Sequence, residues 1–560
     1  MQRRSRVVRS LCVAVLVASI WLPAAAAEPV GFGYAGTASC ATFGCHGNPQ
    51  RGRVEPWRTA YRIWAESDPH SRAGSVLLNE RSARIVRRLQ DADAVFSSSD
   101  TGPSGEDSAA AAVAEQQRYH AILQQRCAGC HVTTGPNAAQ TLERGIRRGR
   151  PGGVGCESCH GPANGWLKSH ATTAWSALDG DRRQKEFGQR NTGALMERAG
   201  LCVECHIGPM LSDSGHSFSV DHDLIAAGHP RLSFEFSAAL ANLPPHWDRK
   251  RDRERNGQPF FHHAAWRFGQ FQTVARTTLG YQLRQQAENS LLEFSHFDCF
   301  SCHGDLAQSL SWRQGGSQGR AGVSNRRDRI APFPELDKTG SAEIATPVYP
   351  GLPSFDDSPF RMLTAIADGM DAHRVAFRQP LERTRRSLAG IWPAAASSWR
   401  RFDQRVAGDL AAPARSADWT AGSSGIQGCG ELLDSMGRSS QAFAQAIWGE
   451  AAIRRLLSDL ATNLRRRGTV RWEDGRNLYL AVAALQFDLE EIDSERATSL
   501  RSANRQLAEL LEPNREQPVS IYSAPPRLDA NDPRWHASLL RLEQAIAEFP
   551  PQLDEGNTDR

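Results

Sequence analysis

One motif constrains this chain more than any other feature, a cysteine pair whose second cysteine is followed directly by histidine. With 12 cysteines and 17 histidines in 560 residues, about 0.008 copies of Cys-x-x-Cys-His would arise by chance. The sequence contains four such copies and one longer variant, with four residues between its cysteines. The regular copies are Cys127, Cys130 and His131; Cys156, Cys159 and His160; Cys202, Cys205 and His206; and Cys299, Cys302 and His303. The longer one is Cys40, Cys45 and His46.

This motif predicts covalent attachment of haem c. The two thiols add to the haem vinyl groups as thioethers, and the adjacent imidazole becomes the proximal ligand of the iron. Zinc knuckles and redox-active disulfides also use Cys-x-x-Cys, but neither needs a histidine directly after the second cysteine. We therefore expect five haems, with proximal ligands His46, His131, His160, His206 and His303.

The longer first motif leaves an alternative open. Both thiols can reach one porphyrin edge if Ala41 to Gly44 bulge outward, and Gly44 supplies backbone freedom beside Cys45. A Cys40–Cys45 disulfide with an exposed His46 is the competing interpretation. It would leave four covalent haems instead of five.

The first 27 residues predict a cleaved secretory signal peptide. Arginines precede an apolar stretch from Leu11 to Pro23, and small residues lead to a cleavage site after Ala27. The stretch is shorter than the roughly 20 apolar residues that span a bilayer, and nothing later approaches that length. We expect a periplasmic protein with no transmembrane segment in the mature chain. Four signal arginines account for the difference between 66 basic and 62 acidic residues, so charge indicates no nucleic-acid partner.

The histidines divide the remainder of the chain. Fifteen of the 17 lie at or before His303. We expect a multihaem cytochrome c domain over 28–312, a linker or extended crossing rich in Gly, Pro, Ser and Arg over 313–356, and a helical C-terminal domain over 357–560. The predicted fold class is mainly α with extensive coil. Residues 93–118, rich in Ala, Ser, Gly and Asp, are expected to form a flexible surface insertion.

Apolar spacing predicts two helices in the C-terminal half. Ile453, Leu457, Leu460 and Leu464 form one stripe at helical spacing, and a second amphipathic run extends from Glu473 to about Glu491. These helices are expected to form a small bundle packed against the haem domain.

The second axial ligand of each iron decides between an electron carrier and a catalyst. The haem region contains only Met196 and Met210 as methionines, so bis-histidine ligation should dominate. Proline flanks two of the candidate distal histidines and fixes the backbone beside them. The distal candidates are His70, His170, His229, His222 and His296, followed by His120 and His246, with His216, His262 and His263 as weaker ones.

The motifs resemble those of the cytochrome c-554/c-prime family from residue 33 to about 206. Cys127-Ala-Gly-Cys130-His131, Gly-Cys156-Glu-Ser-Cys159-His160-Gly-Pro and Cys202-Val-Glu-Cys205-His206 look like consecutive haem sites, and Asp68-Pro-His70-Ser-Arg-Ala resembles the segment with a distal ligand. The resemblance implies a periplasmic multihaem electron carrier with haem packing like that of hydroxylamine oxidoreductases and pentahaem nitrite reductases. It also implies that His170 caps the haem at Cys40 and Cys45. The long first motif, the fifth haem and the helical C-terminal half depart from the tetrahaem pattern.

Two functional hypotheses follow. The first is an exported pentahaem cytochrome that passes single electrons between redox partner proteins. The second is an oxidoreductase that acts on hydroxylamine, nitrite or nitric oxide at one five-coordinate haem, although the sequence lacks the Cys-x-x-Cys-Lys variant usual in nitrite reductases. A role as subunit of a larger redox complex is compatible with either hypothesis.

Overall fold

The structure is a computed structural model, and it describes 14 parts of the chain with gaps between them. They are 32–50, 52–96, 108–133, 142, 145, 152–211, 216–232, 234–257, 260–286, 293–296, 450–466, 472–492, 494–511 and 533–547. The predicted signal peptide and the linker over 313–356 lie outside the described residues. So does the last haem motif, with its residues Cys299, Cys302 and His303.

The described chain is mainly helical with connecting coil, which confirms the predicted fold class. Contacts divide it into two units, Met1–Ser39 with Cys156–Asn191 and Cys40–Gly155 with Thr192–Arg560. No helix in the described ranges is both long enough and apolar enough to cross a membrane.

The first unit is small and surrounds the third motif. Its helices are α7 (Cys156–His160), α8 (Thr173–Ser176) and α9 (Gly180–Phe187), and the 3-10 turn η1 (Thr37–Cys40) lies at its boundary. Trp166 and Trp175 pack together with Ala163 as its core. Helix α9 begins where the Asp179 side chain accepts a hydrogen bond from the Arg182 N–H, and it ends at Gly188 in the left-handed conformation.

The second unit contains the other described motifs and one short antiparallel sheet, in which Met210 of β1 (Met210–Leu211) pairs with Phe218 of β2 (Ser217–Phe218). Its helical elements before the C-terminal half are η2 (Pro56–Thr59), α2 (Ala60–Ser67), η3 (Pro69–Arg72), η4 (Ser75–Leu78), α3 (Glu80–Phe96), α4 (Ser108–Ile122), the π-helical turn η5 (Leu123–Cys127), α5 (Ala128–His131), α10 (Leu195–His206), α11 (His222–Ala227), α12 (Phe236–Asn242), α13 (Arg249–Asn256), α14 (Phe261–Gln286) and η6 (Phe294–His296).

The prediction of a flexible insertion over 93–118 is wrong at both ends of that range, because helices extend into it. Helix α3 continues to Phe96, and α4 already begins at Ser108. The alanine run at its start has high helix propensity, which explains why a segment that looked like low-complexity coil forms a helix.

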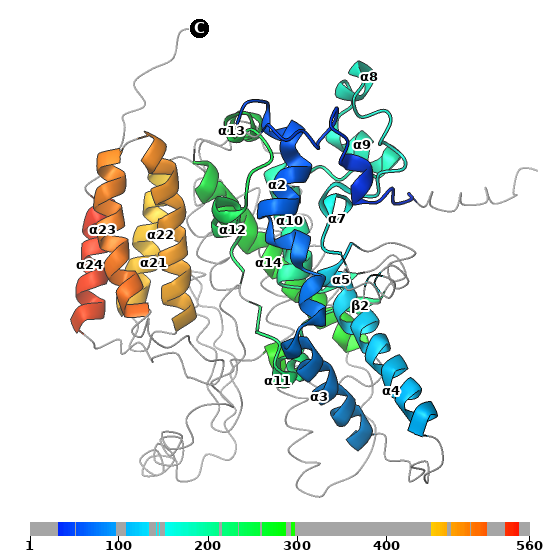
Figure 1. The fold of residues 1–560 in the computed structure, drawn as a ribbon. Helices are drawn as coiled ribbons and strands as arrows, with labels where there is room; N and C mark the ends of the chain where they lie inside the picture. The colour runs from blue at the N-terminus through cyan, green and yellow to red at the C-terminus, as the bar shows by residue number, and fades with distance from the viewer. Residues whose placement is uncertain are drawn as a thin grey trace, which may run out of the picture. The chain divides into compact units, whose positions relative to one another are not determined.

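The described residues of the C-terminal half form four helices that lie side by side (Figure 1). They are α21 (Glu450–Arg466), α22 (Trp472–Ile492), α23 (Ser494–Leu511) and α24 (Pro533–Ala547). The two helices that the sequence predicted are confirmed, and the whole stripe from Ile453 to Leu464 is buried. These helices share one hydrophobic core with α10, α12 and α14.

Besides the shared core, the Asp488 side chain of the bundle contacts the start of α14. Asp488 of α22 is 2% exposed, and its two oxygens accept hydrogen bonds from the His262 and His263 backbone N–H groups, each at 2.8 Å. These N–H groups belong to the first turn of α14 and have no partner within their own helix. Asp488 therefore caps a helix more than 200 residues away in the sequence.

Burial makes this contact sensitive to pH. Burial raises the pKa of Asp488 from 3.8 to about 7, although the hydrogen bonds from His262 and His263 oppose the shift. The folded state therefore binds a proton that the unfolded state releases between these two values. Stability contributed by Asp488 is greatest below about pH 4 and is lost as the pH rises toward 7.

We predict that the free energy of unfolding of the native protein falls, relative to that of Asp488→Asn, as the pH rises from about 4 to about 7. The expected difference is roughly 2 kcal/mol or more, because asparagine does not titrate. Urea unfolding at a series of pH values measures it. Glu509→Gln, an exposed substitution on α23, should give no such difference. A native-minus-Asp488→Asn difference that does not vary with pH would contradict the prediction.

Candidate haem-binding sites

His131 and His229 face each other. His131 ends the short helix α5, and His229 follows Gly228, whose φ of 119° lets the chain turn sharply after α11. Their ring centroids lie 6.4 Å apart with nearly perpendicular planes. The sequence named His131 as a proximal ligand and His229 as a distal candidate, and the structure brings the two together.

Arginines of α3 hold the turn that carries His229. Arg81 donates to the Gly228 carbonyl at 2.7 Å and Arg88 donates to the Ala227 carbonyl at 3.2 Å. These carbonyls at the end of α11 lack partners within their own helix, so the two cations satisfy them and favour the negative end of the helix dipole. The position of His229 is thus fixed by a helix that lies far earlier in the chain.

His70 and His206 form a second facing pair. His206 ends α10, while His70 lies in η3, which Pro69 begins. Their ring centroids are 5.9 Å apart, again with nearly perpendicular planes. Phe234 stacks on His206, with its ring centroid 4.7 Å from that of the imidazole.

The backbone at and just after η3 contacts both histidine pairs. It carries the His70 ring, and one residue after η3 the Ala73 carbonyl accepts a hydrogen bond from His131 Nδ1 at 2.9 Å. Residues 153 and 154 pack directly against it, since Val154 N–H donates to the His70 carbonyl and a Cβ on Gly153 would lie 2.4 Å from the same oxygen. Only glycine fits at position 153 without displacing η3.

Three of these four histidines have their Nδ1 atom bound to an oxygen acceptor. His131 donates to Ala73, His229 to the Pro230 carbonyl at 2.8 Å, and His70 to the Asp68 carboxylate at 2.8 Å. Because carbonyl and carboxylate oxygens can only accept, each Nδ1 carries the proton. The Nε2 lone pair of each ring then remains for a metal.

The spacing of both pairs fits an iron between the rings. A metal–imidazole nitrogen bond is roughly 2 Å long, so a ring centre lies about 3 Å from the metal and two opposed ring centres about 6 Å apart. The observed 5.9 and 6.4 Å agree with this value. Two opposed histidines suit a haem iron, whose other four ligands are porphyrin nitrogens. The described chain contains no group of three or more His, Cys, Asp and Glu side chains arranged for a metal.

Burial favours the neutral form of one imidazole in each pair, His206 and His229. Burial lowers the pKa of His206, and the neighbouring His70 lowers it further. Burial also lowers the pKa of His229, with a smaller contribution from His131. For Asp68, burial raises the pKa, but the hydrogen bonds from His70 outweigh it and keep the carboxylate ionised. A neutral ring with an anionic acceptor behind it is the form that binds a metal.

The eight described motif cysteines form no disulfides with one another. Burial raises the pKa of Cys127 to about 11. A hydrogen bond with Cys205 lowers the pKa of Cys130, against the effect of burial. This contact places the second cysteine of one motif beside the second cysteine of another, so the attachment points of these two sites are neighbours.

The last motif is not part of the described chain. Residues 297–303 carry its two thiols, Cys299 and Cys302, and its proximal candidate His303, and all of them lie outside the described residues. Haem attachment by Cys299 and by Cys302 therefore stays a prediction from the sequence.

The first motif forms a tight turn. The Cys45 and Gly47 N–H groups both donate to the Thr42 carbonyl, at 3.0 and 2.9 Å. The expectation that Gly44 gives the loop its freedom was wrong, because a Cβ there would meet nothing and its φ is not positive. At Gly47 a Cβ would lie 1.9 Å from the Ala41 carbonyl oxygen, so that position requires glycine.

His46 of this motif contacts Trp57. Its Nδ1 donates to the Trp57 carbonyl at 2.7 Å, which is the same arrangement as in the facing pairs. Burial lowers the pKa of His246 most, and the charge of His46 lowers it further, against that of Asp68. His246 packs edge-on against Trp247, and the sequence ranked it below other distal candidates.

The third motif belongs to the first unit and is organised by Glu157, between its cysteines Cys156 and Cys159. This carboxylate is 2% exposed and accepts hydrogen bonds from the N–H groups of Ala35, Gly36 and Ala163, at 2.7 to 2.8 Å. His170 lies in the same unit, and its Nδ1 donates to the Leu167 carbonyl at 2.7 Å. Pairing of His170 with the haem at the first motif would join the two units and stays a prediction.

The remaining histidines have other surroundings. The His222 ring packs edge-on against Phe294, and His296 ends η6. His216 Nε2 is bound to the Gln125 carbonyl at 2.8 Å, which leaves it poorly suited to a metal. His262 and His263 lie at the start of α14, and His120 in α4 contacts Tyr119.

Sequence reasoning overlooked several residues that support the ligands. In the sequence, Asp68 stands out only as part of the segment that resembles the family and not as the acceptor for His70, although an acid two residues before a candidate ligand is a usable signal. Trp57 and Glu157 were not singled out. Their roles depend on contacts that the sequence does not display.

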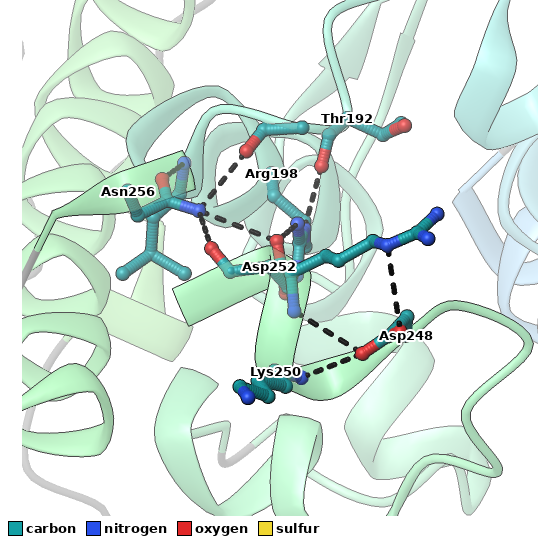
Figure 2. A network of polar contacts seen from close by, with 9 residues as sticks. Thr192, Arg198, Asp248, Lys250, Asp252 and Asn256 are labelled. Atoms are coloured by element: carbon teal, nitrogen blue, oxygen red, sulfur yellow. Dashed lines mark hydrogen bonds and ion pairs between the residues drawn. The ribbon is translucent and has the colours of Figure 1, made fainter. Parts of the chain in front are cut away.

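A network around Arg198 anchors the start of α10, the helix that ends in His206 (Figure 2). The Arg198 guanidinium binds both Asp252 oxygens at 2.7 Å and donates through Nε to the Thr192 carbonyl at 2.7 Å. Asn256 accepts from Leu195 N–H at 2.9 Å and donates to the Gly193 carbonyl at 3.1 Å. Helix α13 is thereby fixed to the N-terminus of α10.

Comparison with known proteins supports haem chemistry. Residues 90–161 match the protein family described as cytochrome c554 and c-prime. The matched range contains two complete motifs, the one that ends in His131 and the one that ends in His160. The match supports a c-type cytochrome family, with covalently bound haem c and a role in electron transfer. No curated protein and no solved structure matches the chain.

We predict that Asp252→Ala lowers the free energy of unfolding by about 3 kcal/mol, because it leaves the largely buried Arg198 cation without its carboxylate. Asp248→Ala, at the N-cap of the same helix, should cost only about 1 kcal/mol. Urea unfolding followed by far-UV circular dichroism compares the two variants. Equal losses would show that the Arg198–Asp252 pair does not hold the helices together.

Proposed function

We propose that this protein is an exported pentahaem c-type cytochrome that transfers single electrons between periplasmic redox partners. The proposal is based on two pairs of neighbouring histidines, His131 with His229 and His70 with His206. In each pair, one histidine belongs to a motif and the other comes from a distant part of the chain. The match to the cytochrome c554 and c-prime family supports the same chemistry. The signal-like N-terminus supports export.

Ten cysteines would hold the five haems, and the proximal histidines of the motifs would hold the irons. When bound, each haem supplies an iron that alternates between the ferrous and ferric states. The residues of the chain would keep His70, His131 and His229 oriented toward the iron, because Nδ1 of these three rings donates to a fixed oxygen. The ionised Asp68 behind His70 increases the basicity of that ring, which favours the ferric state and a lower potential.

The facing pairs favour a carrier over a catalyst. Two histidines at one haem iron would leave no open position for a small substrate, so the two pairs would suit outer-sphere electron transfer. The proximity of Cys130 to Cys205 supports close packing of the two haems that these cysteines would hold. The alternative, an oxidoreductase for hydroxylamine, nitrite or nitric oxide, requires a five-coordinate haem at one of the other three motifs.

We predict that His229→Ala and His70→Ala each convert one low-spin haem to high spin without loss of any covalent haem. Attachment depends on the cysteines, whereas the spin state depends on the second axial ligand. Electron paramagnetic resonance of the oxidised variants measures the change. His216→Ala is the matched control and should leave the spectrum unchanged, because its Nε2 is bound to Gln125. An unchanged low-spin spectrum in His229→Ala and His70→Ala would refute the assignment.

The number of haems is tested by intact-mass spectrometry of the mature protein. We predict the mass of a chain that carries five haems, including one at Cys40 and Cys45 and one at Cys299 and Cys302. A mass with four haems and two fewer hydrogens would identify a Cys40–Cys45 disulfide instead. Fewer than four haems would contradict the proposed function.

A further inference from the structure

Trp57 connects the first motif to the protein surface. Its indole side chain is 44% exposed, its ring centroid lies 5.8 Å from that of His46, and its carbonyl accepts the hydrogen bond from His46 Nδ1. Phe43, inside the motif loop, is 66% exposed. Trp57 thus contacts both the proximal candidate His46 and the neighbouring Arg58.

Two basic side chains lie near Trp57, Arg58 directly and Arg251 through Glu55. The Arg58 guanidinium lies 5.5 Å from the Trp57 ring centroid, in cation–π geometry. Glu55 accepts a hydrogen bond from the Trp57 indole N–H, and its other oxygen lies 3.9 Å from Arg251 of α13. Glu55 thus joins Trp57 to α13, and the exposed Arg53 and Lys250 lie on the same two segments.

These two segments concentrate positive charge. Residues 52–62 and 248–255 together contain eight lysines and arginines against four acids, in a chain that is otherwise nearly balanced. One of the four acids, Asp252, is buried and paired with Arg198. A local excess of this size attracts anionic groups and increases their rate of encounter.

We propose that Trp57, Arg53, Arg58, Lys250 and Arg251, here called the Trp57 surface, form the docking site for an acidic redox protein that exchanges electrons with the haem at Cys40 and Cys45. This inference rests on the proposed function. Arginine and tryptophan are the side chains that contribute most to protein interfaces, and a carboxylate-rich partner complements the charge. A partner protein that contacts Trp57 would be separated from His46 only by the Trp57 side chain.

The composition of the surface argues against a membrane as the occupant. A helix that lies on a membrane needs an apolar face, whereas α13 consists of charged residues and one asparagine, Arg-Lys-Arg-Asp-Arg-Glu-Arg-Asn. The exposed aromatic residues stand singly beside the motif and do not form an extended apolar strip. A protein with a carboxylate-rich face is therefore the occupant that fits.

The test compares the haem-loaded native protein with Arg58→Glu/Arg251→Glu in stopped-flow oxidation by two inorganic oxidants. For anionic ferricyanide, we expect the rate at low ionic strength to fall about 10-fold in the variant and to lose most of its salt dependence. For cationic tris(phenanthroline)cobalt(III), the rate should rise. Poly-L-glutamate, a stand-in for an acidic protein face, should inhibit the ferricyanide reaction of the native protein and not that of the variant.

Arg84→Glu/Arg505→Glu is the matched control, since it makes the same charge change at two exposed positions outside the Trp57 surface. Equal effects of the two double variants would overturn the docking proposal, as would binding of the native protein to phosphatidylglycerol vesicles that depends on Arg58 and Arg251. Covalent haem is quantified on every sample as the pyridine haemochrome. A native protein without haem would refute the proposed function itself, whereas a fully loaded protein insensitive to these charges would refute only the docking site.

Discussion

The candidate sites depend on imidazole rings held at a fixed separation. The ring centroids of the two pairs lie 5.9 and 6.4 Å apart, which fits one metal between two imidazoles, and hydrogen bonds to backbone carbonyls or to the Asp68 carboxylate fix the tautomers of His70, His131 and His229. Neighbouring elements hold the histidines of these pairs in position. Helix α3 holds the turn before His229, Gly153 allows close packing on η3, and the Arg198 network anchors the helix that ends in His206.

The two pairs are parts of one arrangement. The segment from Pro69 to Ala73 supplies a ring to one pair and a carbonyl to the other, and Cys130 contacts Cys205 between the two motifs. Movement of η3 would therefore disturb both sites together. The C-terminal helices add rigidity at a distance, because Asp488 caps α14, and α14 packs along α10. The haem region and the helical half thus stabilise each other.

The sequence predicted features that depend on residues close together in the chain, and it could not predict contacts between residues far apart in the chain. The motifs, the helices around Ile453 and Glu473, and the rigid positions of His70 and His229 beside prolines followed from spacing and backbone restriction. The proximity of His229 to His131 and the capping of α14 by Asp488 depend on contacts between residues far apart in the chain, for which no local pattern exists. The glycine needed by the first motif was misassigned to Gly44, because the tight approach of Gly47 to Ala41 arises only once the turn has formed.

The central claim is that facing histidines bind haem iron on both sides. Near-infrared magnetic circular dichroism of the oxidised native protein tests it most directly, because the charge-transfer band of low-spin ferric haem distinguishes bis-histidine from histidine–methionine ligation and is absent in five-coordinate haem. The intensity of this band is calibrated against total covalent haem. We predict at least two bis-histidine haems per chain. Fewer than two, or a spectrum dominated by high-spin haem that binds carbon monoxide after reduction, would contradict it.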